Sequence, residues 1–290
     1  MKAKNRIAAF ILTVMVMLAI SANIFAAEPC RANIAARNGE FYEKSIDVTI
    51  DGQNYSGDVY LISNTAYVPL REFACYSDDP IITWDASESR ADVRTDSLTL
   101  TVYADSYVIE ANGRALYCEF GSFVRNGKLL VPLRALSSAF GYDCDYDRAT
   151  DTIILSRKKA AIESGDSYYD SDELYWLSRI IYAEAGAESF DGKLAVGNVI
   201  RNRVLSGEFP NTIIDVIFDT QNGVQFSPVS NGTIYSEPDR DSILAAKLTI
   251  EGVEIAGDSL YFLNEELAES KWIVSNCRYV MTIGCHDFYT

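Results

Sequence analysis

Histidine is almost absent from this sequence, which has a single one, His286, in 290 residues. A zinc site with two or more imidazole ligands, a His-Glu-x-x-His helix and a catalytic Cys-His-His arrangement are therefore excluded. Basic residues are also few, because 25 lysines and arginines stand against 41 aspartates and glutamates and leave a formal net charge of −16. A surface of this sign repels phosphate backbones and anionic lipid, so nucleic acid is not expected as a partner. We expect no metal ion and no cofactor.

Long apolar runs are missing beyond the N-terminus. The run at residues 7–20 follows three basic residues and leads into small residues near Ala26. Such an order is typical of a secretory signal peptide, and the 14 residues of the run fall short of the roughly 20 that a membrane anchor needs. We expect a signal peptide over residues 1–27 and a secreted mature protein that has no membrane segment. Loss of the three basic residues changes the net charge to −19.

Cysteine is sparse but even in number. Six cysteines permit three disulfides in an oxidising compartment, in any of 15 pairings. Cys277 and Cys285 are close in the chain, and we expect a bridge between them; the alternative is a pair of buried free thiols. The remaining four are Cys30, Cys75, Cys118 and Cys144.

The middle of the chain contains an internal repeat. Residues 67–73 (Tyr-Val-Pro-Leu-Arg-Glu-Phe) match residues 130–136 (Leu-Val-Pro-Leu-Arg-Ala-Leu) at an offset of 63. Asp51-Gly52 corresponds to Asn112-Gly113, and each pair is a tight-turn signal between alternating strands. The proline cannot donate to a sheet ladder and is suited to open a helix. Each unit therefore predicts a hairpin, a short helix and another hairpin, which makes residues 46–157 a duplicated β-rich module.

This module resembles the copper amine oxidase N-terminal-like domain, a duplicated unit of secreted proteins, over nearly all of residues 46–157. The resemblance implies no copper chemistry, and the segment contains no histidine and no cluster of metal-ligand type. Two roles remain open, a passive spacer and a module that binds the wall or a regulatory partner. Solvent-exposed aromatic side chains favour the second role.

A polar linker at residues 158–170 precedes a domain over residues 171–290 in which the apolar period changes from two toward 3.6. Asp170 and Glu173 form a capping box at its start. The pattern predicts a mostly helical domain with a small sheet, and the whole chain is of the α+β class. Four helices are expected. The first begins at Asp170, and the other three cover residues 192–204, 212–218 and 240–252. The expected extended segments are 259–263 and 279–290.

Glu184 lies among apolar neighbours in the first of these helices. Burial raises the pKa of a carboxyl group, and a raised pKa lets a general acid keep its proton near neutral pH. The other interpretation is a structural glutamate paired with Arg179 or Arg201.

Seven short motifs follow one another through this domain. They are Tyr-Ala-Glu-Ala at 182–185, Gly-Lys-Leu-Ala-Val-Gly-Asn-Val-Ile-Arg-Asn-Arg-Val at 192–204, Phe-Pro-Asn-Thr at 209–212, Gln-Phe-Ser-Pro at 225–228, Leu-Tyr-Phe-Leu-Asn at 260–264, Ser-Lys-Trp at 270–272 and Thr-Ile-Gly-Cys-His-Asp-Phe-Tyr at 282–289. In this order they resemble the SleB/CwlJ-type cell wall hydrolases, which include the spore cortex-lytic enzymes. The resemblance implies a lysozyme-like domain that cleaves peptidoglycan glycan strands in the cell wall or spore cortex, with Glu184 as the catalytic acid.

The chain departs from the family pattern at two positions. Gly186 stands where family members often have a basic residue, which removes a possible charge partner of Glu184. Cys285 replaces the asparagine of the family's Gly-Asn-His, but His286 is kept.

A single carboxyl group suffices for a lytic transglycosylase, because the 6-hydroxyl of N-acetylmuramic acid (MurNAc) attacks within the same sugar. Hydrolysis needs a second carboxylate, for which Glu188 is a candidate, although it can equally be a capping or surface residue. An N-acetylmuramoyl-L-alanine amidase and a non-catalytic wall-binding protein are the alternative functions. Aromatic, amide and hydroxyl side chains suited to a sugar groove are Tyr182, Gln225, Phe226, Ser227, Asn264, Trp272 and His286, each of which can instead serve packing.

Overall fold

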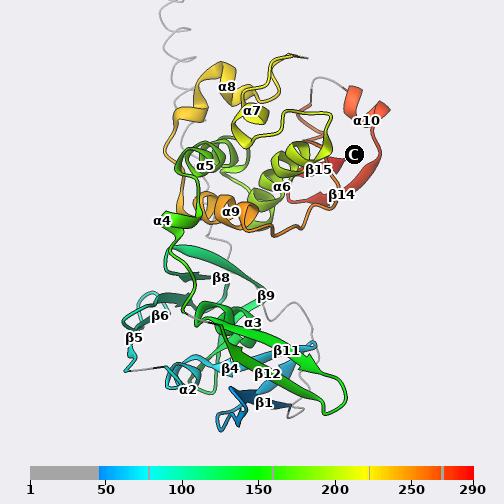
Figure 1. Cartoon of the computed structure of the whole chain (residues 1–290). Helices are drawn as coiled ribbons and strands as arrows, with labels where there is room; N and C mark the ends of the chain where they lie inside the picture. Colours follow the sequence, from blue (N-terminus) through cyan, green and yellow to red (C-terminus); the bar gives the residue numbers. More distant parts are fainter. Residues whose placement is uncertain (1–45, 78, 159, 222, 269–270) are drawn as a thin grey trace, which may run out of the picture. The chain divides into compact units, whose positions relative to one another are not determined.

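The computed structural model describes residues 46–77, 79–158, 160–221, 223–268 and 271–290 (Figure 1). The chain divides into the units Met1–Cys30 and Arg31–Thr290, and all described residues belong to the second unit. The expected signal peptide lies outside the described residues. Within the described part, no helix has the length and apolar character needed to cross a membrane.

The first part of the described chain is rich in sheet. Eight of its strands form one sheet in the order β3-β4-β10-β9-β8-β7-β6-β5, and four form another in the order β11-β12-β1-β2, where β1 runs parallel to β12. The bounds are β1 (Asp47–Ile50), β2 (Gln53–Asn54), β3 (Tyr60–Ile62), β4 (Thr65–Pro69), β5 (Ile81–Asp85), β6 (Arg90–Arg94), β7 (Thr99–Tyr103), β8 (Ser106–Ala111), β9 (Arg114–Arg125), β10 (Lys128–Pro132), β11 (Tyr142–Asp147) and β12 (Thr152–Arg157).

The two Val-Pro-Leu-Arg segments fold alike. Pro69 ends β4 and caps α2 (Leu70–Ala74) with φ −64° and ψ 124°, and Pro132 ends β10 and caps α3 (Leu133–Ala139) with φ −56° and ψ 123°. β4 and β10 pair antiparallel so that Val68 faces Val131, and both side chains are fully buried. The predicted succession of strand, proline and short helix is therefore confirmed in both segments.

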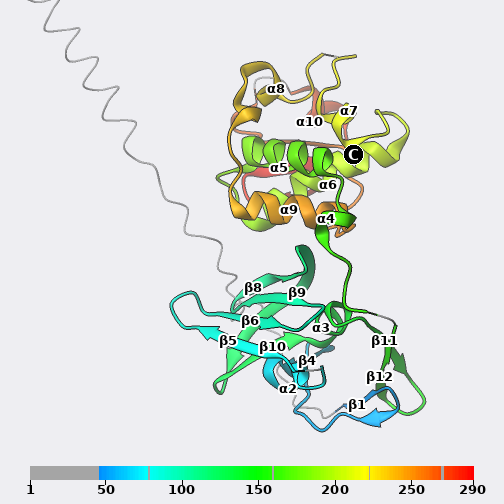
Figure 2. The ribbon, with the colours of Figure 1, turned by 60° about the vertical axis from the view of Figure 1, so that its left-hand side comes forward.

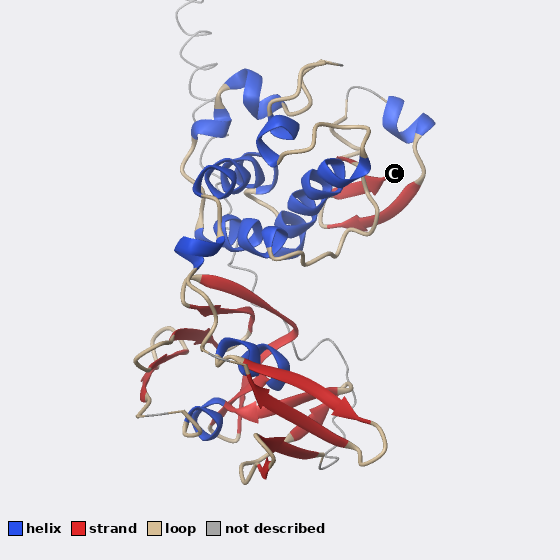
Figure 3. Cartoon of the chain, in the orientation of Figure 1, coloured by secondary structure: helices blue, strands red, loops and turns tan. Residues whose placement is uncertain are grey.

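The second part is mostly helical with a small sheet (Figure 3). Its elements are α4 (Gly165–Tyr168), α5 (Ser171–Ala185), α6 (Phe190–Ser206), α7 (Ile213–Ile217), α8 (Ser227–Asn231), the 3-10 helix η2 (Thr233–Tyr235), α9 (Arg240–Ile250), β13 (Tyr261–Leu263), α10 (Trp272–Asn276), β14 (Tyr279–Ile283) and β15 (His286–Tyr289). The four predicted helices correspond to α5, α6, α7 and α9, and Asp170 caps α5 by accepting hydrogen bonds from the backbone N–H groups of Asp172 and Glu173.

The polar segment 158–170, which the sequence predicts to be a linker, includes α4, whose N-cap Ser164 accepts a hydrogen bond from the Asp166 N–H group. One expectation for this region needs correction. The extended segment expected at residues 279–290 is a hairpin, because Gly284 adopts a positive φ of 61° and turns the chain between β14 and β15. A serine cap and one left-handed glycine set these features, and the apolar period does not reveal either of them.

Helices α5, α6 and α9 pack against one another and form the core of the helical region (Figure 2). Gly197 allows α6 to come close to its neighbours. A Cβ atom at this position would lie 2.3 Å from Thr249 Oγ1 on α9 and 3.0 Å from Ile181 Cδ1 on α5. The apolar face of α5 is fully buried at Leu177 and Ile180, and this packing fixes the end of the helix that bears Glu184.

The expected bridge between Cys277 and Cys285 is wrong. The five cysteines among the described residues are free thiols, and Cys30 lies outside them. Strand β14 lies between the two positions, and its residues Tyr279–Ile283 extend about 13 Å at about 3.3 Å per residue. A disulfide requires Cα atoms within about 7 Å of each other, so nearness in sequence does not become nearness in space here.

Candidate active site

A cavity of about 1060 Å³ opens in the helical region. Its walls come from the end of α5, from α6 and the loop after it, from the loop between α7 and α8, and from α8, β13 and α10. Three carboxylates and one arginine line it, together with aromatic, amide and hydroxyl side chains. The charged lining residues are Glu184, Arg203, Glu208 and Asp219.

Glu184 is the penultimate residue of α5 and is half-buried at the cavity wall. Burial raises the pKa of its carboxyl group to about 7, while the charge of Arg203 acts in the opposite direction. The carboxyl group therefore exists in both its protonated and ionised forms near neutral pH, which suits a group that first gives and then takes a proton.

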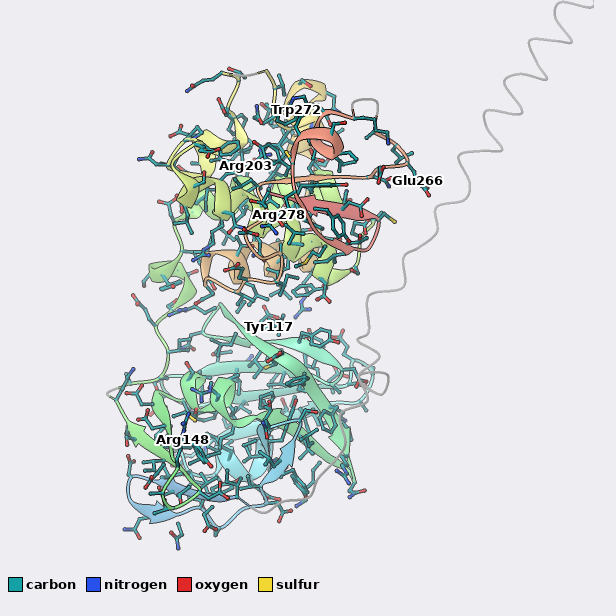
Figure 4. All side chains as sticks on the ribbon, turned by 90° about the vertical axis from the view of Figure 1, so that its right-hand side faces the viewer. Tyr117, Arg148, Arg203, Glu266, Trp272 and Arg278 are labelled. Carbon is teal, nitrogen blue, oxygen red and sulfur yellow. The ribbon has the colours of Figure 1, made fainter. Side chains whose placement is uncertain are left out.

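Arg203 is the residue that sequence reasoning did not single out. It lies on α6, is only 5% exposed, and donates from Nε to the Leu260 carbonyl at 2.8 Å. Its pKa is lowered to about 10 by burial, so it remains charged at neutral pH. Figure 4 shows it in the helical region together with Trp272, which also lines the cavity.

Aromatic rings surround the Arg203 guanidinium. Its Cζ atom lies 4.8 Å from the Phe209 ring centroid, 5.2 Å from that of Phe226 and 5.5 Å from that of Tyr261. Cations are attracted to ring faces at such distances. A signal for this position is present in the sequence, because Arg203 follows Val196, Val199 and Ile200 at helical spacing on a face that is buried.

Five predicted site residues come together at the cavity. Besides Glu184 they are Gln225, Phe226, Ser227 and Trp272. Phe226 is buried, whereas Trp272 is 56% exposed and meets the Tyr261 ring edge-on with 6.1 Å between centroids. An exposed aromatic face beside amide and hydroxyl groups is an arrangement that suits sugars, which have apolar faces and hydroxyl-bearing edges.

Comparison with known proteins identifies the family. Residues 187–289 match the cell wall hydrolase family. The chain is 33% identical to the catalytic domain of the germination-specific lytic transglycosylase SleB from Bacillus anthracis, covering 100% of that chain with 44% of its own at a TM-score of 0.39. The chain belongs to the cell wall hydrolase family. Ahead of the cell wall hydrolase domain, residues 49–155 match the copper amine oxidase N-terminal domain.

Two curated relatives of the cell wall hydrolase domain are spore cortex-lytic enzymes. The one from Bacillus cereus is 35% identical over 120 residues, which cover 41% of this chain and 45% of the relative. The one from Bacillus subtilis is 31% identical over 139 residues, which cover 48% and 44%. The chain thus spans less than half the length of these relatives.

Three predicted sugar-binding residues are absent from the cavity lining of the cell wall hydrolase domain. Tyr182 lies against Gly186, where a Cβ atom would be 3.3 Å from its ring. The Asn264 side chain accepts from the Glu266 and Leu267 N–H groups. His286 packs edge-on against the Phe262 and Phe288 rings. Each of these side chains therefore has a structural contact within the helical region.

Glu188, the candidate second carboxylate, also lies outside the lining. Its Oε2 atom accepts a hydrogen bond from the Cys285 N–H group at 3.1 Å and holds the turn between β14 and β15. The charge partners considered for Glu184 lie elsewhere as well. Arg179 pairs with Glu237 at 2.6 Å, and Arg201 lies near Gly252. Arg203 is the cation that acts on Glu184.

Metal-binding potential is low in the part of the cell wall hydrolase domain that the structure describes. There, no group of three or more histidine, cysteine, aspartate or glutamate side chains could hold a metal ion.

Proposed function

We propose that this protein is a secreted lytic transglycosylase that cleaves the bond between MurNAc and N-acetylglucosamine (GlcNAc) in peptidoglycan of the spore cortex or cell wall. The observation that carries the proposal is Glu184, a carboxyl group with a pKa raised to about 7 at the wall of a large polar cavity. The relatives named as spore cortex-lytic enzymes and the solved lytic transglycosylase domain support the substrate class. The family match begins at residue 187, so the role of Glu184 depends on its position in the cavity.

In the proposed reaction Glu184 works first as an acid and then as a base. The protonated carboxyl group gives its proton to the glycosidic oxygen as the bond from MurNAc C1 breaks, and GlcNAc leaves as an alcohol. The carboxylate then takes the proton from the MurNAc 6-hydroxyl, whose oxygen bonds to C1 and forms a 1,6-anhydro ring. The nucleophile belongs to the substrate, so no water has to be positioned and proximity supplies much of the rate.

Hydrolysis is the second candidate reaction, because the cavity contains further carboxylates. Glu208 and Asp219 line the same cavity as Glu184, and a hydrolase needs a second carboxylate to activate water. The half-buried Asp219 already accepts a hydrogen bond from the Gln221 N–H group at 2.9 Å. In a hydrolytic mechanism these two residues replace Glu188 as the candidate bases.

The sheet-rich module is proposed to be a duplicated unit that binds the wall or a wall-associated partner, and the catalytic domain to be lysozyme-like. Trp84 on β5 is 45% exposed and Tyr146 on β11 is 48% exposed. Trp84-Asp85 and Tyr146-Asp147 occupy corresponding places in the sequence repeat, each following the Val-Pro-Leu-Arg segment of its unit. Both strands are sheet edges. Paired exposed aromatics favour a binding role over a passive spacer.

Mass spectrometry of the fragments released from purified peptidoglycan tests the reaction. The wild-type protein, Glu184→Gln and Glu188→Gln are compared, and the last is a matched control because its carboxylate lies outside the cavity. Anhydro-MurNAc ends from the wild type and the control, but not from Glu184→Gln, are expected. Reducing MurNAc ends would indicate hydrolysis, free stem peptides would indicate an amidase, and no release by any variant would favour a non-catalytic wall-binding protein.

A further inference from the structure

We propose that Arg203 binds an acyl carbonyl oxygen of the glycan next to Glu184. This inference rests on the proposed function because it takes the substrate to be an acylated amino-sugar polymer. It adds a recognition element that selects such sugars over unacylated ones, at a residue outside the predicted binding set.

The first support is an unused hydrogen-bond donor. The Arg203 Nη1 atom is buried and has no hydrogen-bond partner among the described residues, and the side chain as a whole is only 5% exposed. Its Nε atom is already bound to the Leu260 carbonyl. A buried donor without an acceptor is unfavourable, so a ligand that brings an acceptor into this cavity removes that penalty.

The second support is that the guanidinium is held in place. The rings of Phe209, Phe226 and Tyr261 surround it, and the hydrogen bond to the carbonyl of Leu260, the neighbour of Tyr261 in the chain, fixes its orientation. A donor fixed before the ligand arrives loses little conformational freedom on binding. Glu184 and Asp219 act on Arg203 only through their charge, so neither carboxylate occupies the unused donor.

The third support is chemical complementarity. An arginine side chain has five N–H donors and no acceptor. A sugar hydroxyl brings a hydrogen that itself needs an acceptor, whereas an acyl carbonyl oxygen only accepts. The glycan offers this group in two places, the 2-acetamido group of both sugars and the lactyl-derived acyl group of MurNAc. Arg203 is therefore matched to either acyl oxygen and poorly matched to an unmodified ring.

Binding measurements on a protein that cannot cleave test the inference. Glu184→Gln and the double variant Glu184→Gln/Arg203→Lys are titrated calorimetrically with chitohexaose, which has acetamido groups, with cellohexaose, which has hydroxyls instead, and with a GlcNAc–MurNAc tetrasaccharide. Lysine keeps the positive charge but lacks the planar guanidinium with its fork of N–H donors. We expect the lysine to weaken chitohexaose binding by about tenfold or more and to change cellohexaose binding less than twofold.

The ligands separate the possible outcomes. A loss confined to the MurNAc tetrasaccharide assigns the contact to the lactyl group, which this saccharide carries as a carboxylate whose oxygens likewise only accept, and supports the inference at that position. An equal loss of affinity for cellohexaose and chitohexaose overturns the inference. It is also overturned if none of the three saccharides binds. A second measurement needs no substitution at Arg203: its guanidinium ¹⁵N signals in Glu184→Gln should move with chitohexaose and stay fixed with cellohexaose. If the wild type binds but releases no fragments, the proposed function fails and the Arg203 contact is still measured.

Discussion

Glu184 at the end of α5 and Arg203 on α6 line one cavity, and each favours the charged form of the other. The charge of Arg203 lowers the pKa of Glu184, and the charge of Glu184 raises the pKa of Arg203. Burial opposes both shifts and is the larger influence on each residue. The carboxyl group consequently keeps a raised pKa of about 7 beside a permanent positive charge. An acid in this state can protonate a leaving group at neutral pH and still ionise afterwards.

The first prediction concerns the pH dependence of cleavage. The kcat/KM reports the free enzyme, so it should fall tenfold per pH unit above about pH 7, where Glu184 loses its proton. Removal of the cation in Arg203→Met should raise the Glu184 pKa and move this limb to higher pH, because Arg203 stabilises the carboxylate. Rates of dye release from labelled peptidoglycan between pH 5 and 9 provide the measurement. A limb that stays at the same pH in Arg203→Met would contradict the assignment.

The second prediction concerns stability. The Glu184 pKa is about 7 in the folded protein, against an ordinary value of 4.5. Its contribution to stability is therefore fully present below pH 4.5 and is lost as pH rises through 7. Glu184→Gln cannot ionise, so it should be more stable than the wild type at pH 8 by about 3 kcal/mol, taking about 1.4 kcal/mol per pKa unit. Urea unfolding at pH 4 and pH 8 measures the difference, which should be close to zero at pH 4.

The third prediction concerns the packing of α6. Gly197→Ala would place a methyl group 2.3 Å from Thr249 Oγ1 and 3.0 Å from Ile181 Cδ1, so it should destabilise the protein by about 1–3 kcal/mol. Thr249→Ala removes the closer of these two atoms. The double variant should therefore be more stable than the sum of the two single losses, as measured by urea unfolding. Simple additivity would show that the three helices do not meet at this glycine.

The fourth prediction concerns the cysteines. Cys285 is exposed, and its thiol pKa is raised mainly by the charge of Glu188. Glu188→Gln should lower that pKa and speed alkylation of Cys285 by iodoacetamide at pH 8, while alkylation of the exposed Cys75 stays unchanged. The buried Cys118 should react only after unfolding. Peptide mapping gives all three rates, and a Cys277–Cys285 peptide from the native protein would refute the hairpin geometry.

Local rules predict much of this fold. The Asp170 cap, the apolar period of α5 and the two Val-Pro-Leu-Arg segments each depend on a few neighbouring residues, and each takes the predicted form. Features that depend on distant neighbours are harder to predict. The contact of Glu188 with the N–H group of Cys285 joins residues 97 positions apart, and no spacing rule marks it.

In the candidate site, too, one residue can be predicted from its neighbours in the sequence and another cannot. Glu184 stands out because it is a carboxylate among apolar neighbours, and the cavity includes it. Arg203 lies on an equally apolar helical face, but its importance depends on rings from the loop after α6, from the residue before α8 and from β13. Aromatic contacts that converge from separate segments cannot be read from any single segment.

The ring enclosure around Arg203 also has a consequence for the timing of biosynthesis. Its last ring belongs to Tyr261, and the carbonyl that anchors the guanidinium belongs to Leu260. A growing polypeptide that has passed Glu184 and Arg203 still lacks both contacts for more than fifty residues. Under the proposed function, a polypeptide interrupted before Leu260 carries the catalytic acid but lacks two of the contacts that position Arg203 beside it.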